Sequence, residues 1–273
     1  MEKTFKYVLV CFLALLAILL LVFMLLALIK KDWSFSFFDE KSQLVLEKEY
    51  EVSSFDEIKI LSTYSDIHVL NHDDSSVKVL VYSANDLVTS EIHNQILEIN
   101  KRDRKYGCFG FCNRHEEVYV YLPKGMTKEM IIQTVSGDIQ LEDLSSSKVN
   151  IKTTSGEVLV KQVFKASIES ISGDINITSV SDGTLKTVSG DINVHSITKR
   201  ILAHTTSGDV LIDDLTLEES GSIETVSGDV EIGNSPKVYI EAKSISGSIE
   251  LGSRDSSFVH LRVKTISGDI LAR

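Results

Sequence analysis

Apolar and polar residues alternate along most of the chain, which is the pattern of strands that bury one face. In one typical stretch, Ile151 alternates with polar neighbours before a Ser-Gly-Glu corner, and Val158 and Val160 resume the alternation after it. Each unit of this kind is expected to be a strand, a corner, a second strand and a looser return such as 161–167. A unit of 17 to 21 residues is too short for a helical crossover, so the pattern predicts parallel strands that stack unit upon unit.

The unit repeats, because a phrase of the type Thr-Val-Ser-Gly-Asp-Ile recurs eight times between residues 133 and 270. A period this short and regular indicates stacked coils, since one unit cannot bury its apolar face alone. The fold class that we predict is all-β: a single-stranded parallel β-solenoid, or β-helix, with the right-handed winding that β-crossovers favour. We interpret the repeat glycines as structural corner residues, because glycine accepts a bend that a residue with a Cβ resists. They are Gly137, Gly156, Gly173, Gly190, Gly208, Gly228, Gly247 and Gly268.

A carboxylate follows seven of these eight glycines, and Ser248 interrupts the row. In one interpretation, each carboxylate accepts hydrogen bonds from nearby backbone N–H groups of the turn. In the other, the row binds a ladder of Ca²⁺ ions. The known calcium repeat, Gly-Gly-x-Gly-x-Asp, is richer in glycine than the phrase found here, which favours the first interpretation.

The region before the repeats, 45–130, is rich in predicted strands but not periodic. We interpret it as an irregular capping region ahead of the Ser-Gly-Asp solenoid of residues 131–273. Within it, the segment 65–69, Ser-Asp-Ile-His-Val, looks like a copy of the corner without its glycine. The final residues, 270–273, stop abruptly after the last corner and are expected to leave an open edge. Strands are expected at 58–60, 65–69, 77–81, 96–99 and 118–121.

Residues 5–29 are mostly apolar, and after Lys6 they form an unbroken run of 23 uncharged residues, 7–29. At about 1.5 Å per residue, a helix of this length spans the ~30 Å hydrocarbon layer of a membrane. The run is too long for the apolar part of a signal peptide, and no small-residue cleavage site closes it. We therefore expect a short tail (1–4), an uncleaved single-pass transmembrane anchor (5–29) and an aromatic juxtamembrane linker (30–44). Two lysines lie on each side of this uncharged run, Lys3 and Lys6 before it and Lys30 and Lys31 after it. The expected extracytoplasmic placement of the C-terminal domain therefore rests on the short tail and not on charge.

Net charge excludes one class of partner. Residues 1–31 hold four basic residues and one acid, and the remaining 242 residues hold 24 basic and 38 acidic residues, a net charge of −14. A surface of this sign repels polyanions and argues against nucleic acid as a partner. The expected partners are the membrane itself and a protein or cell-envelope component.

The segment 101–115 is locally basic, with five Lys or Arg residues against one Asp. Three interpretations stay open. The segment is a long hairpin loop pinned by a Cys108–Cys112 disulfide in an oxidising compartment, or a contact loop for anionic lipid or an acidic partner. In the third, Cys108, Cys112 and His115 bind zinc, although no clear fourth ligand is present. The candidate contact residues are Arg102, Arg104, Lys105, Tyr106, Phe109, Phe111 and Arg114.

Catalytic signatures are missing from the sequence, which holds no nucleophile elbow, phosphate loop, His-Glu-x-x-His or dinucleotide fingerprint. Solenoid enzymes that act on polysaccharides gather acids and an Arg or Lys on one face. Here the acids recur identically, as structural residues do, and Arg200, Arg254 and Arg262 are scattered. We therefore expect no enzyme and no cofactor; the alternative is a carbohydrate-active lyase or hydrolase on the same fold.

The recurring phrase, preceded by Leu-Pro-Lys-Gly at 122–125 and by the N-terminal span, resembles a bacterial family. This is the putative-adhesin β-strand-repeat family, a domain of unknown function with LiaG-like membrane-anchored members. The resemblance covers roughly residues 45–273 and implies a β-helix outside the membrane, with no family catalytic residues to carry over. The function expected from it is binding, as an adhesin-like module, an envelope scaffold or an accessory of a stress response.

Overall fold

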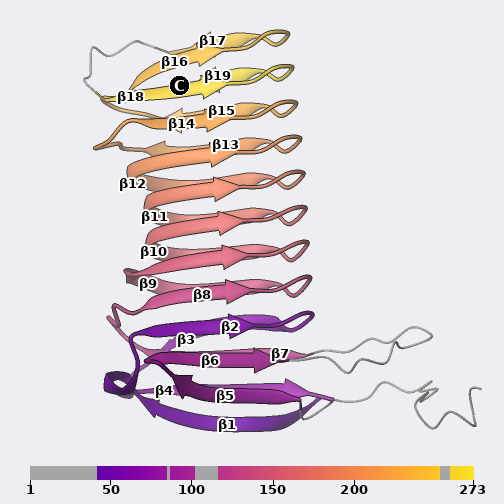
Figure 1. The fold of residues 1–273 in the computed structure, drawn as a ribbon. Helices are drawn as coiled ribbons and strands as arrows, with labels where there is room; N and C mark the ends of the chain where they lie inside the picture. The colour runs from indigo at the N-terminus through magenta and orange to yellow at the C-terminus, as the bar shows by residue number, and fades with distance from the viewer. Residues whose placement is uncertain (1–41, 85–86, 102–115, 253–258) are drawn as a thin grey trace, which may run out of the picture. The chain divides into compact units, whose positions relative to one another are not determined.

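The structure is a computed structural model of the chain, and it describes residues 42–84, 87–101, 116–252 and 259–273 (Figure 1). These residues belong to one compact unit built almost wholly of β-strands, with a single 3-10 turn, η1, at Val52–Ser54. Within those ranges, no helix is both long and apolar enough to cross a membrane, and the segment 5–29 lies outside them. The all-β, mostly parallel, solenoid-like class is confirmed; the right-handed winding and the preceding transmembrane helix stay predictions.

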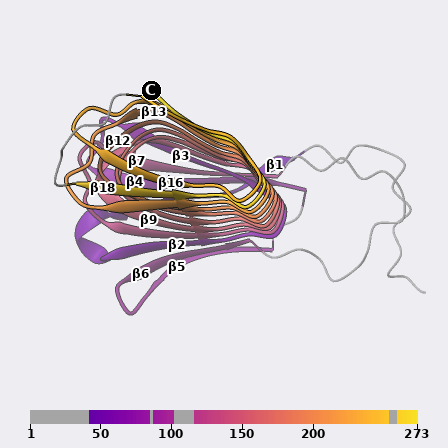
Figure 2. The same cartoon turned by 90° about the horizontal axis from the view of Figure 1, so that it is seen from above.

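The strands form one sheet that folds into two walls around a core (Figures 1 and 2). The post-corner wall contains the strands that follow a corner, and the pre-corner wall contains the strands that lead into the next corner. Strands β9 to β12 are long enough to contribute their first half to the post-corner wall and their second half to the pre-corner wall. In spatial order, the post-corner wall contains β1 (Gln43–Glu51), β4 (Ser76–Ser83), β7 (Glu117–Pro123), β3 (Asp66–His72), β9 (Ile139–Lys152), β10 (Val158–Glu169), β11 (Ile175–Lys186), β12 (Ile192–His204), β13 (Val210–Leu215), β15 (Val230–Asn234), β19 (Ile270–Ala272) and β17 (Ile249–Leu251). The pre-corner wall contains β5 (Val88–His93), β6 (Ile96–Lys101), β2 (Glu57–Leu61), β8 (Glu129–Gln133), the second halves of β9 to β12, then β14 (Gly221–Glu224), β18 (His260–Lys264) and β16 (Tyr239–Lys243).

The alternation of side chains decides what enters the core. In β10, Val158 and Val160 are buried, whereas Leu159 between them points outward. The looser return predicted at 161–167 is wrong for this coil, because β10 continues through it as one strand. Val163 and Ala166 are buried within the return, so the apolar core extends around the bend and keeps the backbone extended against both neighbouring coils.

The order of the coils in space differs from their order in the chain at both ends. The coil of β2 and β3 lies between the coil of β6 and β7 and the coil of β8 and β9. At the other end, the coil of β18 and β19 lies between β14–β15 and β16–β17 (Figure 1). The expectation that 270–273 leave the open edge is therefore wrong. Among the described strands, the open edge belongs to β16 and β17, whose Ile240 and Ile249 are only partly covered.

Antiparallel strands close the N-terminal end of the stack. β1 pairs with β4, β4 pairs with β7, and β5 pairs with β6 across the two-residue turn Asn94–Gln95, whose φ angles of 50° and 64° are typical of tight hairpins. All five strands expected between residues 58 and 121 are present. However, β6 and β7 lie in opposite walls and do not pair, so the hairpin expected across 101–115 is wrong.

The corners stack so closely that each of the eight repeat glycines is required. A Cβ on Gly137 would overlap the carbonyl oxygen of Ser65, and a Cβ on Gly190 would overlap that of Gly173; the other six repeat glycines meet the same obstacle. None of the eight has a positive φ, and Gly125 is the only glycine of the described residues that does. The interpretation from the sequence, that glycine is needed for the bend, is therefore corrected. Glycine is needed because the backbones of two adjacent corners approach too closely to leave room for a Cβ.

Two ladders of hydrogen bonds run through the corners. On the inside, a hydroxyl three residues before each glycine accepts that glycine's N–H, as Thr187 Oγ1 does from Gly190 at 3.1 Å; all are buried except Ser244, which is partly buried. On the outside, Oδ1 of an Asp accepts the N–H of the equivalent residue in the next coil, as Asp191 does from Asp209 at 2.8 Å. The carboxylates are thus hydrogen-bonded to backbone N–H groups as expected, although the donor lies in the neighbouring coil.

The interruption of the carboxylate row at Ser248 follows from the coil order. Ser248 belongs to the β16–β17 coil, and its N–H donates to Asp269 Oδ1 at 2.7 Å. No further coil of the described chain lies beyond it, so a carboxylate at this corner would have no amide to accept. At the opposite end, Asp66 Oδ1 accepts the N–H of Asp138 at 2.9 Å, so the segment 65–69 is a corner without glycine, as predicted.

We predict that Gly190→Ala destabilises the fold by about 1–3 kcal/mol, because the added Cβ forces apart two backbones in the middle of the stack. The free energy of unfolding from urea titration measures this. Gly252→Ala is the matched control, since the Cβ there meets its nearest atom at 3.4 Å, an ordinary contact. Equal stability of the two variants would contradict the close-approach explanation.

Candidate functional site

One outward column of the post-corner wall contains no Asp, Glu, Lys or Arg over seven adjacent coils. We call it the neutral column. Glu231 is the equivalent residue of the next coil, so the column ends there. In a protein with a net charge of −11, an uncharged stripe at outward-facing positions is a candidate contact surface. In spatial order its members are Tyr119, His68, Gln140, Leu159, Asn176, Asn193 and Leu211.

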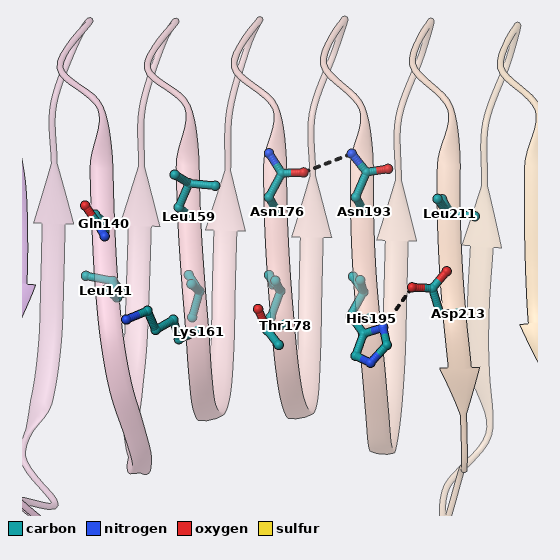
Figure 3. Close-up of a pocket in the computed structure, with 13 residues that line it drawn as sticks. Gln140, Leu141, Leu159, Lys161, Asn176, Thr178, Asn193, His195, Leu211 and Asp213 are labelled. Atoms are coloured by element: carbon teal, nitrogen blue, oxygen red, sulfur yellow. Dashed lines mark hydrogen bonds and ion pairs between the residues drawn. The ribbon is translucent and has the colours of Figure 1, made fainter.

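A shallow groove of about 380 Å³ follows the middle of the neutral column (Figure 3). Leu159 and Leu211 frame it, with 41% and 38% of their surface exposed, and the two asparagines lie between them. A second outward column forms the other margin of the groove, through Lys161, Thr178, His195 and Asp213. The groove therefore combines apolar contact area with a small set of polar groups, which is the usual composition of a ligand site.

The two asparagines form a ladder along the groove. Asn193 Nδ2 donates to Asn176 Oδ1 at 2.9 Å, and Asn176 Nδ2 donates to Glu157 Oε1 at 2.7 Å. This chain fixes both amide planes. Among the described residues no donor reaches Asn193 Oδ1, so an acceptor faces the groove at this position.

The charges of the second column are internally paired. His195 Nδ1 lies 2.8 Å from Asp213 Oδ2, and the hydrogen bond to this carboxylate raises the pKa of His195 above its usual value. Lys161 pairs with Glu142 at 3.2 Å; the backbone N–H of Asn71 and, after it, Lys161 hold the pKa of Glu142 below its usual value. A base with an orienting carboxylate is thus present, but no hydroxyl or thiol of the described residues is hydrogen-bonded to His195 as a nucleophile would be.

Aromatic rings occupy the N-terminal end of the neutral column. His68 stacks on Tyr119 with centroids 4.7 Å apart, Tyr82 meets Tyr119 edge-on at 5.9 Å, and Tyr121 lies 6.3 Å from Tyr119. Burial raises the pKa of Tyr119, and the neighbouring Glu117 adds to this effect. The sequence analysis missed this cluster. Its one signal was the outward alternation of Tyr119 and Tyr121 in a predicted strand.

A second repeated surface follows the tips of the corners. It is a column of β-branched residues whose apolar members include Val135, Ile171, Val188, Ile266 and Ile245, with between 44% and 72% of their surface exposed. Their backbone groups bond from corner to corner, so the column is regular.

The contact loop predicted from the sequence lies outside the described residues. This applies to Arg102, Arg104, Lys105, Tyr106, Phe109, Phe111 and Arg114, to Cys108 and Cys112 with their expected disulfide, and to His115. The points where this segment attaches are described. Because Leu61 pairs with Asn100 and Asp66 pairs with Glu117, the corner at 62–65 corresponds in register to the part of the chain between Asn100 and Glu117.

A buried ion pair fixes these attachment points. Lys101 Nζ lies 2.9 Å from Glu116 Oε2, and their side chains are 1% and 2% exposed. Ser83 Oγ donates to the other carboxylate oxygen of Glu116 at 3.1 Å. A buried pair of this kind holds its geometry, because separating the two partners leaves an uncompensated buried charge.

Comparisons with known proteins agree with this architecture. A family model described as Toastrack DUF4097 matches residues 55–272, and the curated proteins give no match. Among solved structures, the chain is similar to a putative adhesin from Parabacteroides distasonis ATCC 8503, with 17% identity over 85% of this chain and 98% of that chain and a TM-score of 0.52. It is also similar to a putative lipid binding protein from the same organism, with 18% identity over 83% and 96% of the two chains and a TM-score of 0.49. At such identities the similarity shows the fold alone.

Proposed function

The chain belongs to the Toastrack DUF4097 family, and from this premise we propose that it is a non-enzymatic binding protein held at a cell membrane. Its β unit then acts on the extracytoplasmic side as an adhesin-like module, a cell-envelope scaffold or an accessory of a stress response. The observation that carries the binding role is the neutral column with its groove. This surface is built from side chains of five adjacent coils, and its one acid–base pair, His195 with Asp213, has no nucleophile bonded to it among the described residues.

The names of the structural neighbours support a binding role in general, since one is described as a putative adhesin and another as a putative lipid binding protein. Membrane attachment is proposed from the mostly apolar segment 5–29, whose residues 7–29 carry no charge. The net negative charge of the β unit argues against nucleic acid as its partner.

We expect the full chain, produced in cells, to stay with the membrane fraction after alkaline carbonate washing and to react with a membrane-impermeant amine reagent added outside intact cells. Deletion of residues 5–29 is expected to release it from the membrane, because the apolar run supplies the anchor. Fractionation and mass spectrometry of the labelled lysines measure both effects.

A cytoplasmic marker protein, which must remain unlabelled, is the control for cell integrity. Recovery of the full chain in the soluble fraction would contradict the anchor. Labelling that occurs only after the cells are broken would contradict the extracytoplasmic placement.

The basic segment 101–115 is proposed as a contact to anionic lipid headgroups. Two observations on the described residues support this. The chain that follows the apolar run enters the sheet at Gln43, which pairs with Ser83, and Ser83 contacts Glu116 at the base of the basic segment. The described residues that adjoin the two segments therefore lie near each other, which supports the proposal that both segments contact one membrane.

We predict that replacing Arg102, Arg104 and Lys105 with Ser weakens binding of the protein to vesicles containing phosphatidylserine by tenfold or more at low salt, since each cation near an anionic surface contributes about 1 kcal/mol. The triple variant Lys152→Ser, Lys161→Ser and Lys186→Ser loses the same charge from the walls and is the matched control. A variant without 5–29 is used for both, so that the anchor does not mask the effect. Equal vesicle affinity of the two triple variants would contradict the contact.

A further inference from the structure

We propose that the neutral column binds a neutral, linear polysaccharide that lies along the stack of coils, across the groove at Asn176 and Asn193. The proposal rests on the binding function proposed above and names its ligand class. It concerns only residues of the described walls and is independent of the basic segment 101–115.

Charge selects a neutral ligand. The row of corner carboxylates runs beside the column on one side, through Asp138, Glu157 and Asp174, and repels polyanions. These carboxylates do not favour a polycationic ligand either, because most already accept a hydrogen bond from a backbone N–H or a side-chain amide. On the other side the charges of the second column are satisfied within the protein, Lys161 by Glu142 and His195 by Asp213.

Backbone pairing excludes a peptide that would add as a strand. Each strand under the groove, from β9 to β13, is bonded to a neighbouring coil on both sides. Addition of a strand requires an unpaired edge, and this part of the wall has none. A ligand in the groove therefore meets side chains alone.

The side chains of the column match the two faces of a sugar ring. Gln140, Asn176 and Asn193 are amides, which both donate and accept hydrogen bonds and so suit hydroxyl groups. Leu159 and Leu211 are exposed beside them and offer apolar area to C–H faces, and the Tyr119–His68 stack extends this area at one end. No charged side chain interrupts the column from Tyr119 to Leu211, so a chain can continue beyond the groove itself.

The spacing of the column suits a polymer better than a small molecule. Adjacent coils stand about 4.8 Å apart, so equivalent groups recur at that interval along the stack. A β-1,4-linked polysaccharide advances by a comparable length per sugar and turns alternate rings over, so each coil meets one sugar and equivalent hydroxyl groups face every second coil. Contacts to successive sugars then add within one chain. A single sugar would use only one or two coils.

The test is isothermal titration of the full chain in detergent with two neutral hexasaccharides, the β-1,4-linked hexamers of glucose and of N-acetylglucosamine. We expect saturable binding of at least one of them. Asn193→Ala, which removes the acceptor facing the groove, is expected to weaken that binding by about tenfold. Asn150→Ala is the matched control, because Asn150 is an outward amide of β9 in the pre-corner wall, and its affinity is expected to equal that of the unmodified chain.

Leu211→Glu is the second variant, since Leu211 is exposed and takes no part in the amide ladder. The change removes apolar area from the ligand path and adds a hydrated charge that an apolar sugar face would have to desolvate. It is expected to abolish binding while leaving the circular dichroism spectrum unchanged. Absence of binding to both hexasaccharides, or equal affinity of the Asn193, Leu211 and Asn150 variants, overturns the proposal. If the protein stays with the membrane and is labelled from outside but binds neither hexasaccharide, the neutral polysaccharide is excluded as its ligand. The proposed function is then unaffected.

Discussion

The close approach of one corner to the next is the constraint on which the structure depends. The carbonyl oxygen of each corner occupies the space that a Cβ of the next corner would need, as Gly173 shows against Gly190. Glycine at this point lets the coils stack at strand distance, and the neighbouring groups then satisfy the backbone. The Thr or Ser hydroxyl takes the glycine N–H from inside, and the carboxylate takes the N–H of the next coil from outside. One short phrase therefore specifies both the contact and its hydrogen bonds.

The same corner explains how the stack ends. Ser65 supplies a carbonyl to Gly137, and its own corner contains no glycine. In the next coil, that of β6 and β7, the corner position falls between Asn100 and Glu117. At the other end, the N–H of Ser248 donates to the carboxylate of the preceding coil, but Ser248 has no carboxylate to accept a further N–H. From His68 to Leu211 the neutral column is carried by the coils between these ends, so its regular course there is a consequence of the regular corners.

Much of the fold could be predicted from the sequence, because the repeated phrase marks each corner, and the alternation of apolar and polar residues shows which side chains of each strand face the core. The order of the coils could not, because every coil has the same alternation and nothing local in β18 or β19 shows which coil lies beside it. The reason for glycine was also missed, since a one-dimensional pattern does not distinguish a bend from a close approach. The groove was not predictable residue by residue, because Leu159, Asn176 and Leu211 come from separate coils and become neighbours only through the register.

Disulfide crosslinking of corner serines tests the central account of the stack most directly, in a chain whose three cysteines are replaced by Ser. Ser227 and Ser267 belong to adjacent coils, and Ser246 lies one coil further, although it precedes Ser267 in the chain. Adjacent coils are about 4.8 Å apart, within the reach of a disulfide, and twice that distance is beyond it. The account predicts that Ser227→Cys with Ser267→Cys forms a disulfide under mild oxidation and that Ser227→Cys with Ser246→Cys does not. The opposite result would show that the coils stack in chain order and would contradict the account.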